Sequence, residues 1–182
     1  MTWRASLLRV TLAFLRQATE PFLDPTAVDF TQVVADQTAI RKCIPQRFEM
    51  EMLNGVVLLD PEQHLIVGYK DVRADEFWTR GHFPGKPTLP GVLMLETAAQ
   101  LVSFYVTAVK VNEGQLLGLG GVEDSRFRRG VVPGDRLVLV GKGTRVRTRM
   151  TVFAVQGYVG SELAFETTII GVPIGKWEDL GA

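Results

Sequence analysis

The sequence has little of what disulfides and metal sites require. Its 182 residues include one cysteine, Cys43, and two histidines, His64 and His82. A single cysteine excludes an internal disulfide and is typical of a reducing compartment, which predicts the cytoplasm. Two histidines and one cysteine make a His/Cys metal site improbable, and we expect neither a metal nor another cofactor.

Other absences narrow the class of protein. The chain has no G-x-S-x-G motif and no phosphate-binding loop, and residues 118–121, GLGG, do not make a G-x-G-x-x-G motif. The formal net charge is zero and the pI is about 6.7, so bulk charge favours neither nucleic acid nor an anionic membrane as a partner. An apolar content of 46% suits one domain with a real core.

The most informative stretch joins a proline-rich loop to an apolar helix. Pro90 is the last of three prolines in this loop, so a helix can begin only at about Gly91. No proline or glycine interrupts it before about Lys110, and it is apolar on nearly every side, which predicts a helix buried all round. One face carries a polar stripe, Glu96, Gln100, Ser103 and Thr107.

A membrane-spanning helix is the alternative for this apolar run. Glu96 and Gln100 lie inside it, and an acidic residue within a span costs about 3 kcal/mol. We therefore expect burial in protein and no stable membrane insertion.

The flanking sequence alternates with the period of β-strands. Turn residues such as Pro133, Gly134 and Asp135 separate the runs. The expected strands cover residues 48–59, 65–72, 122–128, 136–149, 150–159 and 162–171. One long helix among about six antiparallel strands predicts an α+β domain over residues 39–182.

The first 38 residues are expected to form a helical N-terminal extension. Apolar residues recur at helical spacing over residues 3–15, and Asp24 followed by Pro25 predicts a second helix that runs to about Asp36. The extension could cover the sheet or a tunnel, extend a subunit interface, or lie on a membrane surface.

Residues 81–100, GHFPGKPTLPGVLMLETAAQ, resemble a known family signature. They match every fixed position of G-H-F-P-x-x-P-x-x-P-G-V-L-x-x-E-x-x-A-Q, the pattern of the β-hydroxyacyl-[acyl carrier protein] dehydratases. Residues 125–135 are similar to a second block, A-R-F-R-R-P-V-V-P-G-D, with Gly130 in place of a proline. The resemblance implies a hotdog fold, in which a curved antiparallel sheet wraps around one central helix. It also implies dehydration of (3R)-3-hydroxyacyl thioesters on acyl carrier protein to trans-2-enoyl thioesters, in fatty-acid or related lipid synthesis.

The chemistry needs a base and an acid. His82 is the candidate base because imidazole titrates near physiological pH, and Glu96 is the candidate acid for the departing hydroxyl. The backbone amides of Gly91 and Val92 offer donors for the negative charge on the thioester oxygen. Gln100, one helical turn after Glu96, can orient it, and the resemblance adds Phe83 to the residues that bind substrate.

The resemblance also implies partners. It predicts a homodimer, or a trimer of dimers, in which the histidine and the glutamate of one site come from different subunits. It predicts acyl carrier protein as the substrate-bearing partner and no nucleic acid. Arg145, Arg147 and Arg149 share one strand face, which is either a solvated surface or a docking surface for this acidic carrier.

Three departures keep other functions open. Gln46, Phe48 and Glu49 stand where the family usually has histidine, tyrosine and proline. In relatives this segment shapes the acyl tunnel, so chain-length preference is open. The alternatives are a hotdog acyl thioesterase and a non-catalytic acyl-binding paralogue.

Overall fold

A computed structural model describes residues 20–112 and 114–180 of the chain; the helix expected over residues 3–15 lies outside the described residues. The long apolar helix is α3, Gly91–Ala108, and it begins directly after Pro90 as expected. It ends two residues earlier than predicted, because Lys110 has a positive φ of 57° and cannot continue the helix.

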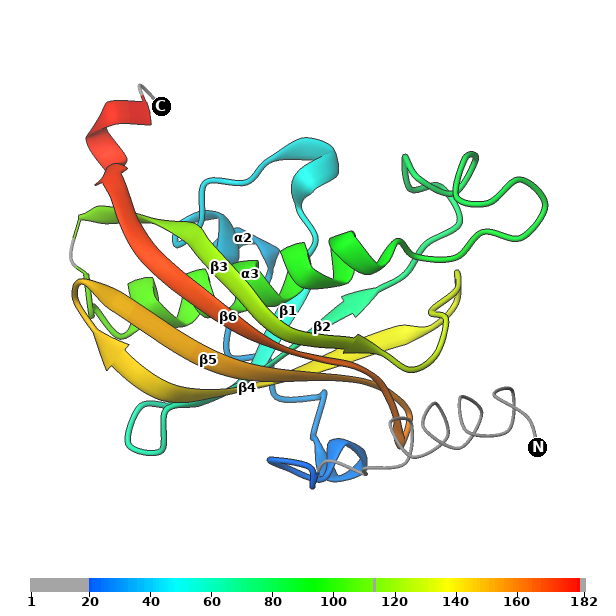
Figure 1. Cartoon of the computed structure of the whole chain (residues 1–182), viewed down its shortest axis with the longest axis horizontal. Coiled ribbons are helices and arrows are strands. Elements are labelled where there is room, and N and C mark those ends of the chain that lie inside the picture. The colour runs from blue at the N-terminus through cyan, green and yellow to red at the C-terminus, as the bar shows by residue number, and fades with distance from the viewer. Residues whose placement is uncertain (1–19, 113, 181–182) are drawn as a thin grey trace, which may run out of the picture.

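Six antiparallel strands form one sheet in the order β1-β2-β4-β5-β6-β3. Their bounds are β1 Gly55–Asp60, β2 Leu65–Asp71, β3 Gln115–Phe127, β4 Arg136–Arg147, β5 Met150–Val159 and β6 Glu162–Lys176. The strands curve around α3, which lies along one face of the sheet (Figure 1). The predicted α+β hotdog arrangement is confirmed.

The main core lies between α3 and the inner face of the sheet. Leu101, Val102 and Tyr105 of the helix are fully buried and belong to one cluster with Phe153 and Ile169 of the sheet. Among the described helices, α3 alone is long and apolar enough to cross a membrane by length and composition. Its place against the sheet makes it a core helix.

The outer face of the sheet is also apolar, and the segment that precedes the family-like region covers it. Val67, Val140 and Tyr158 are buried there in a second cluster, against which Leu23 and Phe30 pack. In Figure 1 this segment, in blue, lies below the sheet. Residues 20–35 therefore cover the sheet, one of the roles left open by the sequence. A division of the chain at about residue 38 stays a prediction.

The helix predicted over residues 25–36 is wrong. The structure has only a 3-10 turn there, η1 Pro25–Ala27, which Asp24 caps by accepting hydrogen bonds from Thr26. Asp29 makes a second local turn by accepting from Thr31, so these side chains replace the hydrogen bonds of a helix. The helix begins only after Asp36, as the short α2 Gln37–Arg41.

The strand predicted to start at Phe48 begins only at Gly55. Residues Phe48–Met50 form a 3-10 turn, η2, and Phe48 has a positive φ of 58°. The backbone that follows is not free to join the sheet, because the side chain of Gln100 binds the carbonyl of Met50 and the amides of Met52 and Leu53. A side chain fifty residues away thus replaces the strand ladder.

Candidate active site

His82 lies in the loop before α3 with its ring held by the backbone. Its Nδ1 is 2.7 Å from the carbonyl oxygen of Thr88. A carbonyl oxygen only accepts, so Nδ1 carries the proton and the neutral imidazole keeps an unprotonated Nε2. The ring of Phe83 stacks on the imidazole, with 4.0 Å between the ring centroids. The geometry therefore offers Nε2 as a base.

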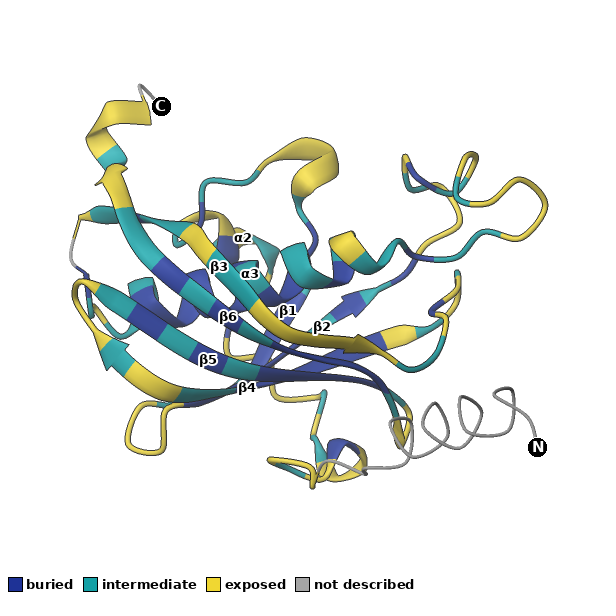
Figure 2. Ribbon diagram, viewed as in Figure 1, coloured by how far each residue is buried: buried dark blue, intermediate teal, exposed yellow. Residues whose placement is uncertain are grey.

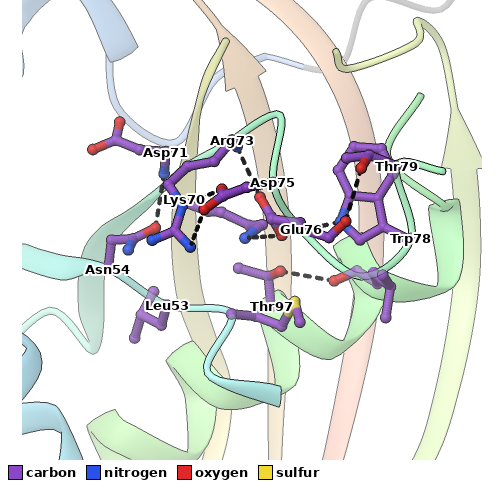
Figure 3. A network of polar contacts seen from close by, with 12 residues as sticks. Leu53, Asn54, Lys70, Asp71, Arg73, Asp75, Glu76, Trp78, Thr79 and Thr97 are labelled. Atoms are coloured by element: carbon purple, nitrogen blue, oxygen red, sulfur yellow. Dashed lines mark hydrogen bonds and ion pairs between the residues drawn. The ribbon is translucent and has the colours of Figure 1, made fainter. Parts of the chain in front are cut away.

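A buried ion pair anchors the start of this loop (Figure 3). Lys70 Nζ of β2 lies 2.8 Å from Glu76 Oε2, and the two side chains are only 4% and 10% exposed. Glu76 also accepts from Trp78 Nε1 and from the backbone N–H of Arg73. The carbonyl of Trp78 in turn accepts from the backbone N–H of His82, at 2.8 Å. The sheet thus fixes where the loop presents the imidazole.

The first residue of α3, Gly91, lines the same cavity as His82. A cavity of about 420 Å³ is lined by His82, Gly91, Met94, Phe127 and Arg129, among others. The N–H groups of Gly91 and Val92 find no acceptor within the described chain. They are free donors at a helix N-terminus, where the dipole favours negative charge.

Glu96, on α3, is oriented by the amide one helical turn further on. Gln100 is fully buried, and its Oε1 accepts from the amides of Met52 and Leu53 at 3.0 and 3.3 Å. Its Nε2 must therefore point the other way, and it donates to Glu96 Oε1 at 2.8 Å. Among the described residues, none donates a hydrogen bond to Glu96 Oε2. That oxygen is available to carry a proton toward a ligand.

The cavity beside Glu96 has a polar side and an apolar side. Its volume is about 280 Å³, and Gln46 and Ser103 line it together with Glu96. The rest of its wall is mostly apolar and comes from Pro45, Ala99, residues 116–119 of β3, Ile169, Gly171 and Ile174 of β6, and Leu180. Nothing in the sequence indicated that Leu180, near the C-terminus, reaches this site. Gln46 stood out only as a departure from the family pattern.

In the described part of the chain, the predicted base and acid line two different cavities. His82 lines the larger cavity at the start of α3, whereas Glu96 lines the smaller one between α3 and the β3–β6 edge. Of the other predicted site residues, Phe83 stacks on His82, Gly91 lines the cavity of His82, and Gln100 lies beside Glu96. Val92 lines neither of these two cavities.

The arginine face predicted on β4 lies far from His82. Arg145 and Arg147 are exposed at the β4–β5 hairpin, which Figure 1 shows at the opposite end of the sheet from the loop before α3. Arg149 is also exposed, but it lies in the turn after β4 and not on the predicted strand face. Two other basic residues, Arg80 and Lys86, are exposed on the loop that carries His82. Within residues 20–112 and 114–180, no group of three or more His, Cys, Asp or Glu side chains is placed to hold a metal.

The fold is similar to solved structures at low sequence identity. The dehydratase heterocomplex ApeI:P from Xenorhabdus doucetiae matches with a TM-score of 0.64 and 15% identity over 78% of this chain and 95% of that one. Cj0977, a sigma28-regulated virulence protein from Campylobacter jejuni, matches with a TM-score of 0.59 and 14% identity over 80% of this chain and 95% of that one. At these identities the likeness shows the fold alone.

Sequence comparison identifies the family as well as the fold. A 3-hydroxyacyl-[acyl-carrier-protein] dehydratase FabZ of Natranaerobius thermophilus is 38% identical over 129 residues, which cover 71% of this chain and 90% of the relative. The FabZ of Desulforamulus reducens is 33% identical over 135 residues, 74% of this chain and 94% of the relative. The model of the FabA-like domain matches residues 44–168, which include the His82 loop, all of α3 and most of the sheet. The chain therefore belongs to the FabA-like family.

Proposed function

We propose that this protein is a 3-hydroxyacyl-[acyl-carrier-protein] dehydratase of fatty-acid or related lipid synthesis that works in the cytoplasm. The proposal rests on one observation: hydrogen bonds fix the orientation of both the His82 ring and the Glu96 carboxyl group. The Thr88 carbonyl leaves His82 Nε2 as a base, and Gln100 leaves Glu96 Oε2 as the oxygen that holds a proton. Dehydration needs both groups, one for each carbon of the new double bond.

The reaction follows from these two groups. His82 Nε2 takes the proton from C2 of the 3-hydroxyacyl thioester, and the thioester oxygen gains negative charge. The free N–H groups of Gly91 and Val92 stabilise that charge at the positive end of α3. Glu96 Oε2 gives its proton to the C3 hydroxyl, the C3–O bond breaks, and the C2–C3 double bond forms as water leaves. The proton on His82 then returns to Glu96 through solvent.

A second copy of the chain supplies the missing half of each site. β3 is an edge strand, and most of its second half is exposed (Figure 2). Phe127, at the end of β3, and Val92, at the start of α3, are 47% and 71% exposed. They form an apolar surface that one chain leaves uncovered. Pairing of two β3 edges would cover this surface and bring His82 of one copy towards Glu96 of the other. A trimer of such dimers is the larger assembly we consider.

Acyl carrier protein is the substrate-bearing partner, and we place its docking surface on the His82 loop. Arg80 and Lys86 are exposed there, and neither forms an ion pair with a described residue. They suit an acidic carrier that has to deliver its thioester to His82. The exposed hairpin at Arg147 is the competing surface.

The test offers purified protein a 3-hydroxyacyl thioester on acyl carrier protein. Enoyl absorbance reports dehydration, and a thiol reagent reports hydrolysis. We expect an equilibrium with the trans-2-enoyl thioester and an intact thioester bond. His82→Ala and Glu96→Gln are each expected to abolish turnover, while Glu62→Gln, at the exposed β1–β2 turn, leaves it unchanged.

Mixing the two inactive variants tests the shared site. Subunit exchange between His82→Ala and Glu96→Gln is expected to restore part of the activity, because hybrid dimers contain one intact site. An active monomer in light scattering would contradict the shared site. Thiol release without enoyl product would indicate a thioesterase, and tight binding with neither product an acyl-binding protein.

A further inference from the structure

Gln46 has a buried oxygen without a partner. Its Oε1 is shielded from solvent and accepts no hydrogen bond within the described part of the chain. A buried amide oxygen left unpaired costs about 1–3 kcal/mol, so proteins rarely keep one without a reason. Gln46 lines the cavity that also contains Glu96 and Ser103.

The other end of the same amide faces the carboxylate of Glu96. Gln46 Nε2 lies 3.5 Å from Glu96 Oε1, the oxygen that also accepts from Gln100 at 2.8 Å. The reverse orientation would bring the amide oxygen against a carboxylate oxygen, and two acceptors repel. The amide nitrogen therefore faces Glu96, and Oε1 is the atom that lacks a donor.

A ligand in this cavity can supply that donor. Within the acyl group and its thioester linkage, the carbonyl oxygen and sulfur only accept hydrogen bonds, whereas the C3 hydroxyl has a hydrogen to donate. This hydroxyl is also the group that must meet Glu96 for dehydration. An acceptor beside the acid therefore matches the reacting end of the substrate.

We propose that Gln46 binds the C3 hydroxyl of the substrate through Oε1 and so presents the hydroxyl oxygen to Glu96. This inference rests on the proposed dehydratase function and deepens it. The hydroxyl donates its own hydrogen to Gln46, which turns an oxygen lone pair toward the proton on Glu96 Oε2. When the C3–O bond breaks, the departing water keeps the original hydrogen and gains the one from Glu96. In the reverse reaction Gln46 holds the attacking water.

The first test replaces Gln46 by methionine, which has a similar length and no polar end. We expect kcat/KM to fall about tenfold in dehydration, the loss typical of one neutral hydrogen bond. The hydration rate falls by the same factor, because the equilibrium constant is unchanged. Gln63→Met, at the exposed β1–β2 turn, is the matched control and leaves both rates unchanged.

A ligand without the C3 hydroxyl shows whether Gln46 binds this hydroxyl or only maintains the shape of the cavity. The saturated acyl thioester of the same chain length inhibits by filling the same cavity but offers no C3 hydroxyl. We expect its inhibition constant to be equal for the wild type and Gln46→Met. A reshaped cavity would weaken both ligands alike, and that result overturns the proposal.

Gln46→Glu provides a second, independent measurement. It keeps an acceptor oxygen but places a second carboxyl near Glu96, so both cannot ionise together and the pKa of Glu96 rises. We expect the basic limb of the kcat/KM profile to move to higher pH. If Gln46→Met does not fold, Gln46→Leu takes its place with the same two ligands. An unmoved limb in Gln46→Glu counts against the contact between residue 46 and Glu96 on which the proposal rests.

The remaining outcomes are also decisive. A wild-type rate in Gln46→Met overturns the role of Gln46 and leaves the dehydratase function standing. If the wild-type protein does not convert the 3-hydroxyacyl thioester, both the role of Gln46 and the dehydratase function are refuted. Only reduced turnover with an unchanged inhibition constant supports the assignment.

Discussion

Replacing Lys70 by methionine tests whether the buried ion pair positions the catalytic loop. Lys70 Nζ and Glu76 Oε2 are 2.8 Å apart, with 4% and 10% of the side chains exposed. Removing one partner of a buried pair costs about 3–5 kcal/mol because a charge stays behind without compensation. Glu76 keeps the N–H donors of Trp78 and Arg73, so we expect the lower end, about 3 kcal/mol.

The measurement is urea unfolding at a fixed protomer concentration, since assembly contributes to stability. A loss of about 3 kcal/mol corresponds to a fall in Tm of roughly 6–12 °C for a chain of this size. The double variant Lys70→Met/Glu76→Gln removes both charges and is expected to recover most of the loss. Lys42→Met, an exposed lysine, is the control.

Activity at a temperature where the variant stays folded gives the functional readout. The backbone of His82 is bound to Trp78, whose indole N–H donates to Glu76. We therefore expect kcat to fall in Lys70→Met and to recover in the double variant. A loss below 1 kcal/mol with normal kcat would refute the reasoning, because the loop would then not depend on the pair.

Three further predictions concern docking, pH and chain length. Lys86→Glu is expected to raise KM several-fold for a carrier-bound substrate but not for the same acyl group on a small thiol; the same effect from Arg147→Glu instead would move the docking surface to the hairpin. Burial, aided by the charge of Glu166, raises the pKa of Tyr158 to about 12. Its contribution to stability is complete below pH ~10, the ordinary tyrosine pKa, and is lost as the pH rises toward 12, so Tyr158→Phe should flatten urea-measured stability in that range. An unchanged slope would contradict this. Leu180→Ala widens the cavity beside Glu96 and is expected to raise kcat/KM for longer acyl chains relative to shorter ones, and an unchanged ratio would exclude Leu180 from the wall that limits them.

The sequence by itself determined the elements whose signals are local. Pro90 marks the start of α3, the uninterrupted apolar run sets most of its length, and period-two alternation with short turns predicts the strands that follow. These features depend on backbone sterics and on which face of an element is apolar, and both can be read from neighbouring residues. Local signals were also enough to predict that His82 lies in the loop before the helix and that Glu96 lies on the helix.

Only the tertiary structure decided what depends on contacts between distant residues. The strand expected from Phe48 is absent because the side chain of Gln100 takes the hydrogen bonds of residues 50–53. Residues 20–35 follow the outer face of the sheet rather than a helix, since the apolar surface that they cover is assembled from strands far along the chain. The separation of His82 and Glu96 into two cavities and the unpaired oxygen of Gln46 have the same origin. Which groups meet, and which polar atoms are left without a partner, is settled by packing in three dimensions, which the local pattern of a sequence does not encode.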